Sequence, residues 1–209
     1  TDEHVKAFSA SSLNSYIDCP LQFYLTRVET VEEADEVMET VEASMFGSLF
    51  HKVMENLYAP YKGKILKPET LDQILSRTLL IDDEILRAFN TEFFKRKPDQ
   101  NLLALEGNNL LIASVLRKYT IQVLKTDKKH TPFKYVAAEE RCSMQFPIQG
   151  GSRQINIKGF VDRIDEKEGR LRILDYKTGS GKLDFKNLEE VFEHNKDQRP
   201  KFVLQTFLY

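Results

Sequence analysis

Apolar residues recur at a helical spacing through the earlier part of the chain and give way to strand-like runs in the later part. The spacing is clearest at 44–58, where one helix face carries Phe46, Leu49, Phe50, Val53, Met54 and Leu57. The same criterion predicts helices over 9–28, 69–96 and 101–125, with Ser11 or Ser12 as the N-cap of the first. Residues 133–148, 154–164 and 171–177 have the composition of strands. We expect a short helix within 188–198 and another at the end of the chain.

This order of elements predicts an α/β (α+β) fold, with a small mixed sheet flanked by helices. We expect a single domain over residues 1–209, in which 60–132 form an inserted helical lobe and 133–209 form the sheet and its following helix. The acidic stretch at 29–44 is expected to be exposed or partly mobile. Because the chain does not begin with Met and ends inside a predicted helix, we expect it to be a piece of a longer protein.

Two acids and a lysine fall on the predicted hairpin of 154–177. Side chains two apart on a strand share a face, so Asp175 and Lys177 point the same way. The polar link at 165–170 places Asp162 opposite or diagonal to Asp175, with Cβ atoms roughly 5 to 8 Å apart. Two carboxylates at this range can share a hard divalent cation, and a neighbouring lysine suits a phosphate or an attacking water.

Each of these residues also has a plainer interpretation. The hairpin charges could lie on a solvated face, although the apolar residues before each acid make an unpaired charge costly there. His51 and Glu55 share a helix face and could form an ordinary ion pair at the edge of the core. Gly47 either lets this helix approach the sheet closely or marks its N-terminus. Glu139 and Glu140 face opposite sides of a strand, and the pattern does not decide which lies near the acids.

The composition is that of a soluble globular protein of 209 residues, with 41% hydrophobic and 30% charged residues and a formal net charge of -2. No apolar run reaches membrane-spanning length and no secretory signal begins the chain, so we expect a cytoplasmic protein without a membrane partner. The net charge counts against a tight DNA-binding domain acting alone. Cys19 and Cys142 match no metal-binding spacing and are expected to be reduced, partly buried thiols.

Four segments form an ordered series of motifs: Gly-x-x-x-His at 47–51, Gly-x-x-Asp-Arg-Ile-Asp at 159–165, Asp-x-Lys at 175–177 and Gln-x-x-x-Tyr at 205–209. Together they resemble the PD-(D/E)XK nuclease superfamily, in particular its RecB-like branch. That branch includes the nuclease domains of bacterial helicase–nuclease repair complexes and the CRISPR-associated RecB-type nucleases. Residues 9–24 also resemble the family's N-terminal helix, so the resemblance spans nearly the whole chain.

The resemblance implies a restriction-endonuclease-like core and Mg²⁺- or Mn²⁺-dependent hydrolysis of DNA phosphodiester bonds. The metal ligands that it implies are His51, Asp162, Asp175 and the backbone carbonyl of Tyr176. Asp162 and Asp175 are then also catalytic residues, together with Lys177, and the substrate-binding residues are Gln205 and Tyr209. Cys19 resembles the first iron–sulfur ligand of some relatives, so an iron–sulfur cluster would require further cysteines beyond Tyr209.

The function that the resemblance implies is a DNA exonuclease in repair or recombination, within a helicase–nuclease system. DNA and a helicase, or another repair subunit or domain of the full-length protein, are the expected partners. Two alternatives are open from the sequence: a CRISPR-associated RecB-type nuclease, and a non-catalytic DNA-binding or scaffold module of a repair complex.

Overall fold

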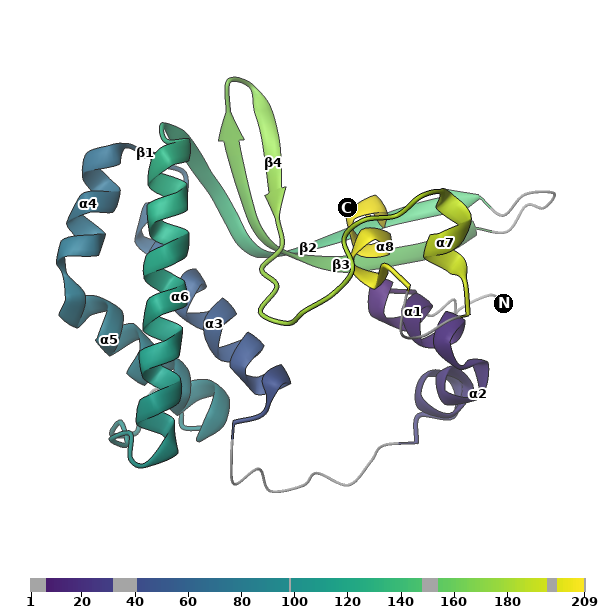
Figure 1. Cartoon of the computed structure of the whole chain (residues 1–209), viewed down its shortest axis with the longest axis horizontal. Coiled ribbons are helices and arrows are strands. Elements are labelled where there is room, and N and C mark those ends of the chain that lie inside the picture. Colours follow the sequence, from purple (N-terminus) through teal and green to yellow (C-terminus); the bar gives the residue numbers. More distant parts are fainter. Residues whose placement is uncertain (1–6, 32–40, 98, 148–153, 195–198, 209) are drawn as a thin grey trace. The chain divides into compact units, whose positions relative to one another are not determined.

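The computed structural model describes residues 7–31, 41–97, 99–147, 154–194 and 199–208 (Figure 1). The chain divides into two compact units. We call residues 37–140 and 162–179 the central unit, and residues 1–36, 141–161 and 180–209 the terminal unit. The long strands β2 (Phe133–Pro147) and β3 (Gln154–Lys167) contribute residues to both units.

Helices dominate the central unit (Figure 1). They are α3 (Ala43–Tyr58), α4 (Pro68–Ser76), α5 (Thr78–Ala88) and α6 (Asn108–His130), with short turns at Ala59–Tyr61 and Phe89–Phe93. The predicted helix at 44–58 is confirmed as α3, and its apolar face supplies Leu49, Phe50, Val53, Met54 and Leu57 to the core. The same core takes Leu71, Ile81, Ile85 and Phe89 from α4, α5 and the turn that follows α5, and Leu116 and Leu124 from α6.

The two longer helical predictions in this unit are wrong in their bounds. The helix predicted at 69–96 is interrupted at Arg77, whose ψ of 69° is not helical. The helix predicted at 101–125 begins only at Asn108, after Gly107 with φ of 54°, and extends to His130. The buried amide of Asn90 explains the late start, because it bonds both the N–H and the carbonyl of Leu103 at 2.8 and 3.0 Å. The N–H and the carbonyl of Leu103 therefore bond the side chain of Asn90 instead of forming helical backbone hydrogen bonds.

The sheet has the strand order β1-β2-β3-β4, where β1 is Ile65–Leu66 and β4 is Arg170–Leu174. β1 pairs antiparallel with β2, and β3 pairs antiparallel with β4. Glu168 and Gly169 join the last pair with φ of 53° and 72°, as a two-residue hairpin turn with two left-handed positions requires. The predicted hairpin is confirmed, but its second strand ends at Leu174, so Asp175 to Lys177 follow the strand instead of belonging to it.

The terminal unit contains α1 (Ala10–Asp18), α2 (Pro20–Phe23), a π turn at Tyr24–Val28, α7 (Leu188–Phe192) and α8 (Lys201–Leu208). Ser9 is the N-cap of α1 instead of the predicted Ser11 or Ser12, and Ser12 completes a capping box with it. A parallel bridge joins Phe8 to Ile157 of β3. Ile17, Val191, Val203 and Leu204 form the small core of this unit.

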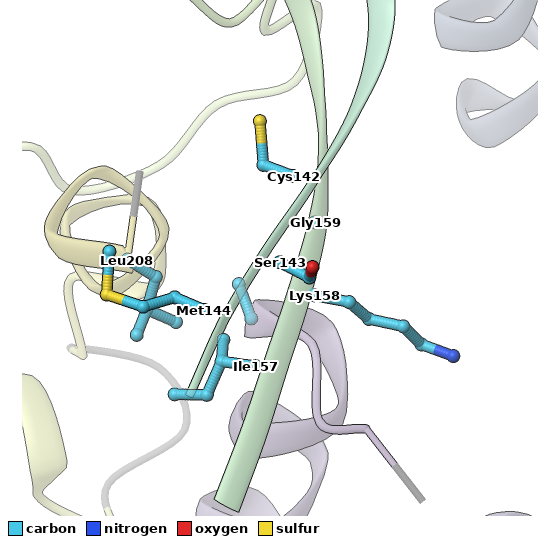
Figure 2. Close-up of a pocket in the computed structure, with 8 residues that line it drawn as sticks. Cys142, Ser143, Met144, Ile157, Lys158, Gly159 and Leu208 are labelled. Carbon is cyan, nitrogen blue, oxygen red and sulfur yellow. The ribbon is translucent and has the colours of Figure 1, made fainter. Parts of the chain in front are cut away.

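A small apolar cavity of about 70 Å³ lies between β2, β3 and α8 within the terminal unit. Figure 2 shows the side chains of Met144, Ile157 and Leu208 gathered on one side, whereas Lys158 extends away from them. Cys142 also lines the cavity and is exposed, so its predicted partial burial is wrong, while Cys19 is partly buried as expected. Among the described residues, no helix is both long and apolar enough to cross a membrane.

Candidate metal centre

Three potential metal ligands from three different elements meet in the central unit. His51 lies on α3, Glu139 on β2 and Asp162 on β3, and one donor atom of each lies within 4.8 Å of the others. The imidazole Nδ1 of His51 is 3.4 Å from Oδ1 of Asp162 and 3.8 Å from Oε1 of Glu139. The side chain of Asp162 is only 9% exposed, so this carboxylate requires a compensating partner.

The orientation of His51 is fixed by the segment that follows β4. Its Nε2 lies 2.9 Å from the carbonyl oxygen of Tyr176. A neutral imidazole carries its proton on one nitrogen, and a proton on Nε2 lets that atom donate to the carbonyl. The lone pair of Nδ1 then faces the two carboxylates. Metal-binding histidines commonly have this arrangement, with the second ring N–H donated to a carbonyl or carboxylate.

Glu139 reaches the site through an irregularity in β2. Its φ is 48°, in the left-handed region that a strand residue other than glycine rarely adopts. A residue of this kind interrupts the regular alternation of a strand and turns a side chain toward a new direction, as β-bulges next to active sites do. Of the two glutamates between which the sequence did not decide, Glu139 therefore faces His51 and Asp162.

The paired register of the hairpin ends just before the two aspartates. Arg163 pairs with Leu174, and Asp162 and Asp175 are the next residues along the two segments, so their predicted opposition stays a prediction. Oδ2 of Asp162 accepts the backbone N–H of Tyr176 at 2.5 Å, across the end of the hairpin. Asp175 lies outside the three-ligand cluster of the described residues, and its carboxylate is 2.6 Å from the ammonium of Lys177.

The electrostatics of the cluster favour a cation. Burial raises the pKa of Asp162, and the nearby Asp175 raises it further, while His51 and the Tyr176 N–H lower it. Burial and then the charge of Asp162 raise the pKa of Glu139. A divalent cation bound between these oxygens would relieve both effects, because it stabilises the ionised carboxylates.

A cleft of about 270 Å³ opens beside the cluster, and His51 and Glu139 form part of its wall. The same wall carries Glu55 and Glu92, with Lys52 paired to Glu55 at 2.7 Å. A phosphate entering a cleft rich in carboxylates would be repelled unless a cation were bound there. The cleft therefore fits an anionic substrate only together with a metal ion.

A buried ionic network beneath the hairpin was not anticipated from the sequence. Arg163 is 1% exposed and binds both oxygens of Asp165 at 2.8 Å. It also donates to Asp127 at 2.6 Å, and Asp127 accepts the hydroxyl of Tyr58 at 2.7 Å. The signal for Asp127 was its position on the face of α6 that also buries Leu116, Thr120 and Leu124. The sequence motif had shown Arg163 and Asp165, without indicating that they form an ion pair.

The remaining predicted residues belong to other parts of the chain. Gln205 lies on α8, in the terminal unit, while Tyr209 and most of the acidic segment 29–44 lie outside the described residues. Gly47 lies inside α3 instead of at its N-terminus, and a Cβ atom there would be 3.4 Å from Oγ1 of Thr178. The interpretation of Gly47 as the N-terminus of the helix is therefore wrong, and its predicted close approach to the sheet stays a prediction, since Thr178 lies after β4.

Comparison with known proteins gives one family for nearly the whole chain. A sequence model of the PD-(D/E)XK nuclease superfamily matches residues 7–209. The chain is 26% identical over 184 residues to an uncharacterized protein of Rickettsia conorii, covering 82% of this chain and 19% of that protein. It is 29% identical over 185 residues to the B subunit of the ATP-dependent helicase/deoxyribonuclease of Carboxydothermus hydrogenoformans, covering 84% of this chain and 16% of that protein. The corresponding protein of Clostridium acetobutylicum is 27% identical over 185 residues, covering 82% and 15%. The chain spans less than a fifth of the length of these relatives.

Proposed function

Because the chain belongs to the PD-(D/E)XK nuclease superfamily, we propose that it is a metal-dependent deoxyribonuclease that uses the cluster around Asp162. The observation that carries this proposal is the convergence of His51, Glu139 and Asp162 from three elements, with donor atoms within 4.8 Å. Nitrogen and carboxylate ligands of this kind fit a divalent cation such as Mg²⁺ or Mn²⁺.

Each residue of the site has a proposed role in the reaction. His51, Glu139 and Asp162 would hold the cation, with Asp175 as a further oxygen ligand of the predicted set. The carbonyl of Tyr176, the other predicted ligand, lies instead against Nε2 of His51, on the ring edge away from Nδ1. When bound, the cation lowers the pKa of a coordinated water and neutralises charge on the phosphate. We propose that Lys177, whose ammonium pairs with Asp175 at 2.6 Å, orients the attacking water or stabilises the negative charge that develops on the phosphate oxygens. Gln205 and Tyr209 are proposed to contact the DNA strand.

The biological setting is proposed from the relatives. Two of them are named as B subunits of an ATP-dependent helicase/deoxyribonuclease. We propose that this chain likewise acts as the nuclease segment of a helicase–nuclease system in DNA repair or recombination, as an exonuclease on single strands. A non-catalytic scaffold would be expected to lose its metal ligands and lysine, whereas Asp162, Asp175 and Lys177 are all present.

A cleavage assay tests this function. The wild-type protein is incubated with end-labelled single-stranded DNA and Mg²⁺ or Mn²⁺, beside Asp175→Ala and Lys177→Ala. We expect cleavage by the wild type and a rate in either variant that is lower by about 10²- to 10³-fold, because Asp175→Ala removes a proposed metal ligand and Lys177→Ala removes a positive charge beside the reacting phosphate. Unchanged circular dichroism spectra would show that both variants fold. Full activity in either variant would refute the assignment of that residue, and metal-independent DNA binding without cleavage would favour a scaffold.

A further inference from the structure

The segment that bears the lysine lies outside the sheet ladder. β4 ends at Leu174, and residues 175–178 adopt no helix or strand. No ladder of regular hydrogen bonds therefore fixes this segment, although it carries the groups that contact His51 and Asp162. Another set of contacts must hold the backbone in place.

Tyr176 provides such contacts through three different groups. Its backbone N–H donates to Oδ2 of Asp162 at 2.5 Å, and its carbonyl lies 2.9 Å from Nε2 of His51. Its side-chain hydroxyl accepts from Nη1 of Arg163 at 3.1 Å. Burial raises the pKa of this phenol, so it remains a neutral acceptor. One residue thus contacts two proposed metal ligands with its backbone and the buried arginine with its side chain.

Arg163 is a rigid anchor for the hydroxyl. Both oxygens of Asp165 and one of Asp127 hold its guanidinium, and the ring of Tyr58 lies 4.2 Å from its central carbon. A guanidinium held by a two-bond pairing and aromatic faces has little freedom to rotate. The hydroxyl bonded to it is restrained in turn.

We infer that the hydroxyl of Tyr176 is a positioning group, which transmits the fixed location of Arg163 to the orientation of His51 and Asp162. This inference rests on the proposed metal site. The predicted role of Tyr176 was limited to its backbone carbonyl, whereas the structure assigns a distinct role to its side chain. Loss of a group that hydrogen-bonds a metal ligand directly commonly lowers metal affinity by about 10- to 100-fold. Because the hydroxyl acts through the backbone of Tyr176, we expect an effect at the lower end of this range.

Tyr176→Phe removes only the hydroxyl and therefore tests its role alone. The phenyl ring keeps its edge contacts with Phe50 and His51, at 5.6 and 5.9 Å between ring centroids. Arg163 keeps both aspartates, so the core ion pairs stay intact. Tyr119→Phe is the matched control, because Tyr119 also packs on Phe50 and is 45% exposed. Both variants should melt close to the wild-type temperature.

Two readouts separate positioning from general stability. In Mn²⁺ titration calorimetry, Tyr176→Phe should bind about 10-fold more weakly than the wild type, and Tyr119→Phe should bind equally well. In metal-free protein, long-range ¹H–¹⁵N NMR should report a proton on Nε2 of His51 in the wild type and a smaller population with this proton in Tyr176→Phe.

The outcomes distinguish this inference from the proposed function. Wild-type Mn²⁺ affinity and an unchanged His51 spectrum in Tyr176→Phe would overturn the positioning role and leave the metal site intact. A wild-type protein that binds no Mn²⁺, but whose His51 spectrum changes on removal of the hydroxyl, would support the positioning role and refute the metal site. An affinity loss equal to that of Tyr119→Phe would also overturn the inference.

Discussion

Each unit of this chain contains a buried arginine, and the two arginines have different neighbours. Arg199 in the terminal unit is 4% exposed, and Arg163 in the central unit is 1% exposed. Arg199 donates to Asp18 at 2.9 Å, to the side chain of Asn14 at 2.5 Å and to the carbonyl of Val191 at 3.3 Å. These partners lie on α1 and α7, so Arg199 joins two helices that are far apart in the sequence.

Arg163 is likewise a buried arginine that pairs with aspartates, but it lies next to a proposed metal ligand. It follows Asp162 directly in β3, and its partners include the hydroxyl of Tyr176. The aspartates that neutralise it do not belong to the three-ligand cluster of the described residues, while the carbonyl of Tyr176 lies 2.9 Å from Nε2 of His51. Removal of one partner from either buried network should destabilise its unit, because a charge is left buried. Only the network of Arg163 also includes a residue, Tyr176, that contacts proposed metal ligands.

Removing the central arginine should have the largest effect on stability. Arg163→Ala leaves the buried Asp127 and Asp165 with only Arg172 as a cation, at 3.4 and 2.8 Å, and breaking the buried pairs of Arg163 costs about 3 to 5 kcal/mol. Urea unfolding followed by circular dichroism measures the loss. Arg117→Ala is the control, because its ion pair with Asp82 is 38% and 43% exposed and should contribute less than about 1 kcal/mol. Equal losses in the two variants would contradict the importance of burial.

Breaking the ion pair of Arg199 should lower the free energy of unfolding by a smaller amount and leave the metal site unchanged. Asp18→Asn removes the carboxylate that pairs with Arg199 and with Lys201, at 2.9 and 2.7 Å. We expect the free energy of unfolding to fall by about 2 kcal/mol, the range for hydrogen bonds to charged groups. Mn²⁺ affinity should equal that of the wild type. A weakened Mn²⁺ site in this variant would show that the two networks are not independent.

The stabilisation that the Asp18 ion pair contributes should decrease at acidic pH. Burial alone would raise the pKa of Asp18, but hydrogen bonds from Lys201 and Arg199 outweigh it and lower the pKa below 3.8. The stabilisation is therefore fully present above pH 3.8 and is lost as the pH falls through the lowered folded-state value. The stability difference between wild type and Asp18→Asn should narrow in that acidic range. A difference that widens on acidification would contradict the assigned ion pair.

The helices and the hairpin that depend on neighbouring residues could be predicted from the spacing of apolar residues and from the turn residues. The apolar period of 44–58 gave the position of α3, and the turn residues near Gly169 gave the hairpin and its register. Those two elements already bring His51 and Asp162 to the site. The four ordered motifs named the family, which the match over residues 7–209 confirms.

Long-range contacts determine what the sequence could not indicate. The left-handed backbone at Glu139 selects this residue over Glu140, and no alternation of apolar and polar residues encodes it. Asp127 shares a face of α6 with buried residues, but the lysines around it are typical of a solvated helix end, and its partner Arg163 is 36 residues away in the sequence. The single-domain prediction for residues 1–209 stays a prediction, as do the catalytic roles of Asp175 and Lys177.

Mn²⁺ titration calorimetry on the matched pair Glu139→Gln and Glu140→Gln tests the central claim most directly. The two variants remove the same charge from adjacent residues, and only Glu139 belongs to the cluster with His51 and Asp162. We predict that the wild type and Glu140→Gln bind Mn²⁺ with equal affinity and that Glu139→Gln binds at least about 10-fold more weakly, since it loses a charged ligand. Equal affinity in all three proteins, or no binding by the wild type, would contradict the metal site.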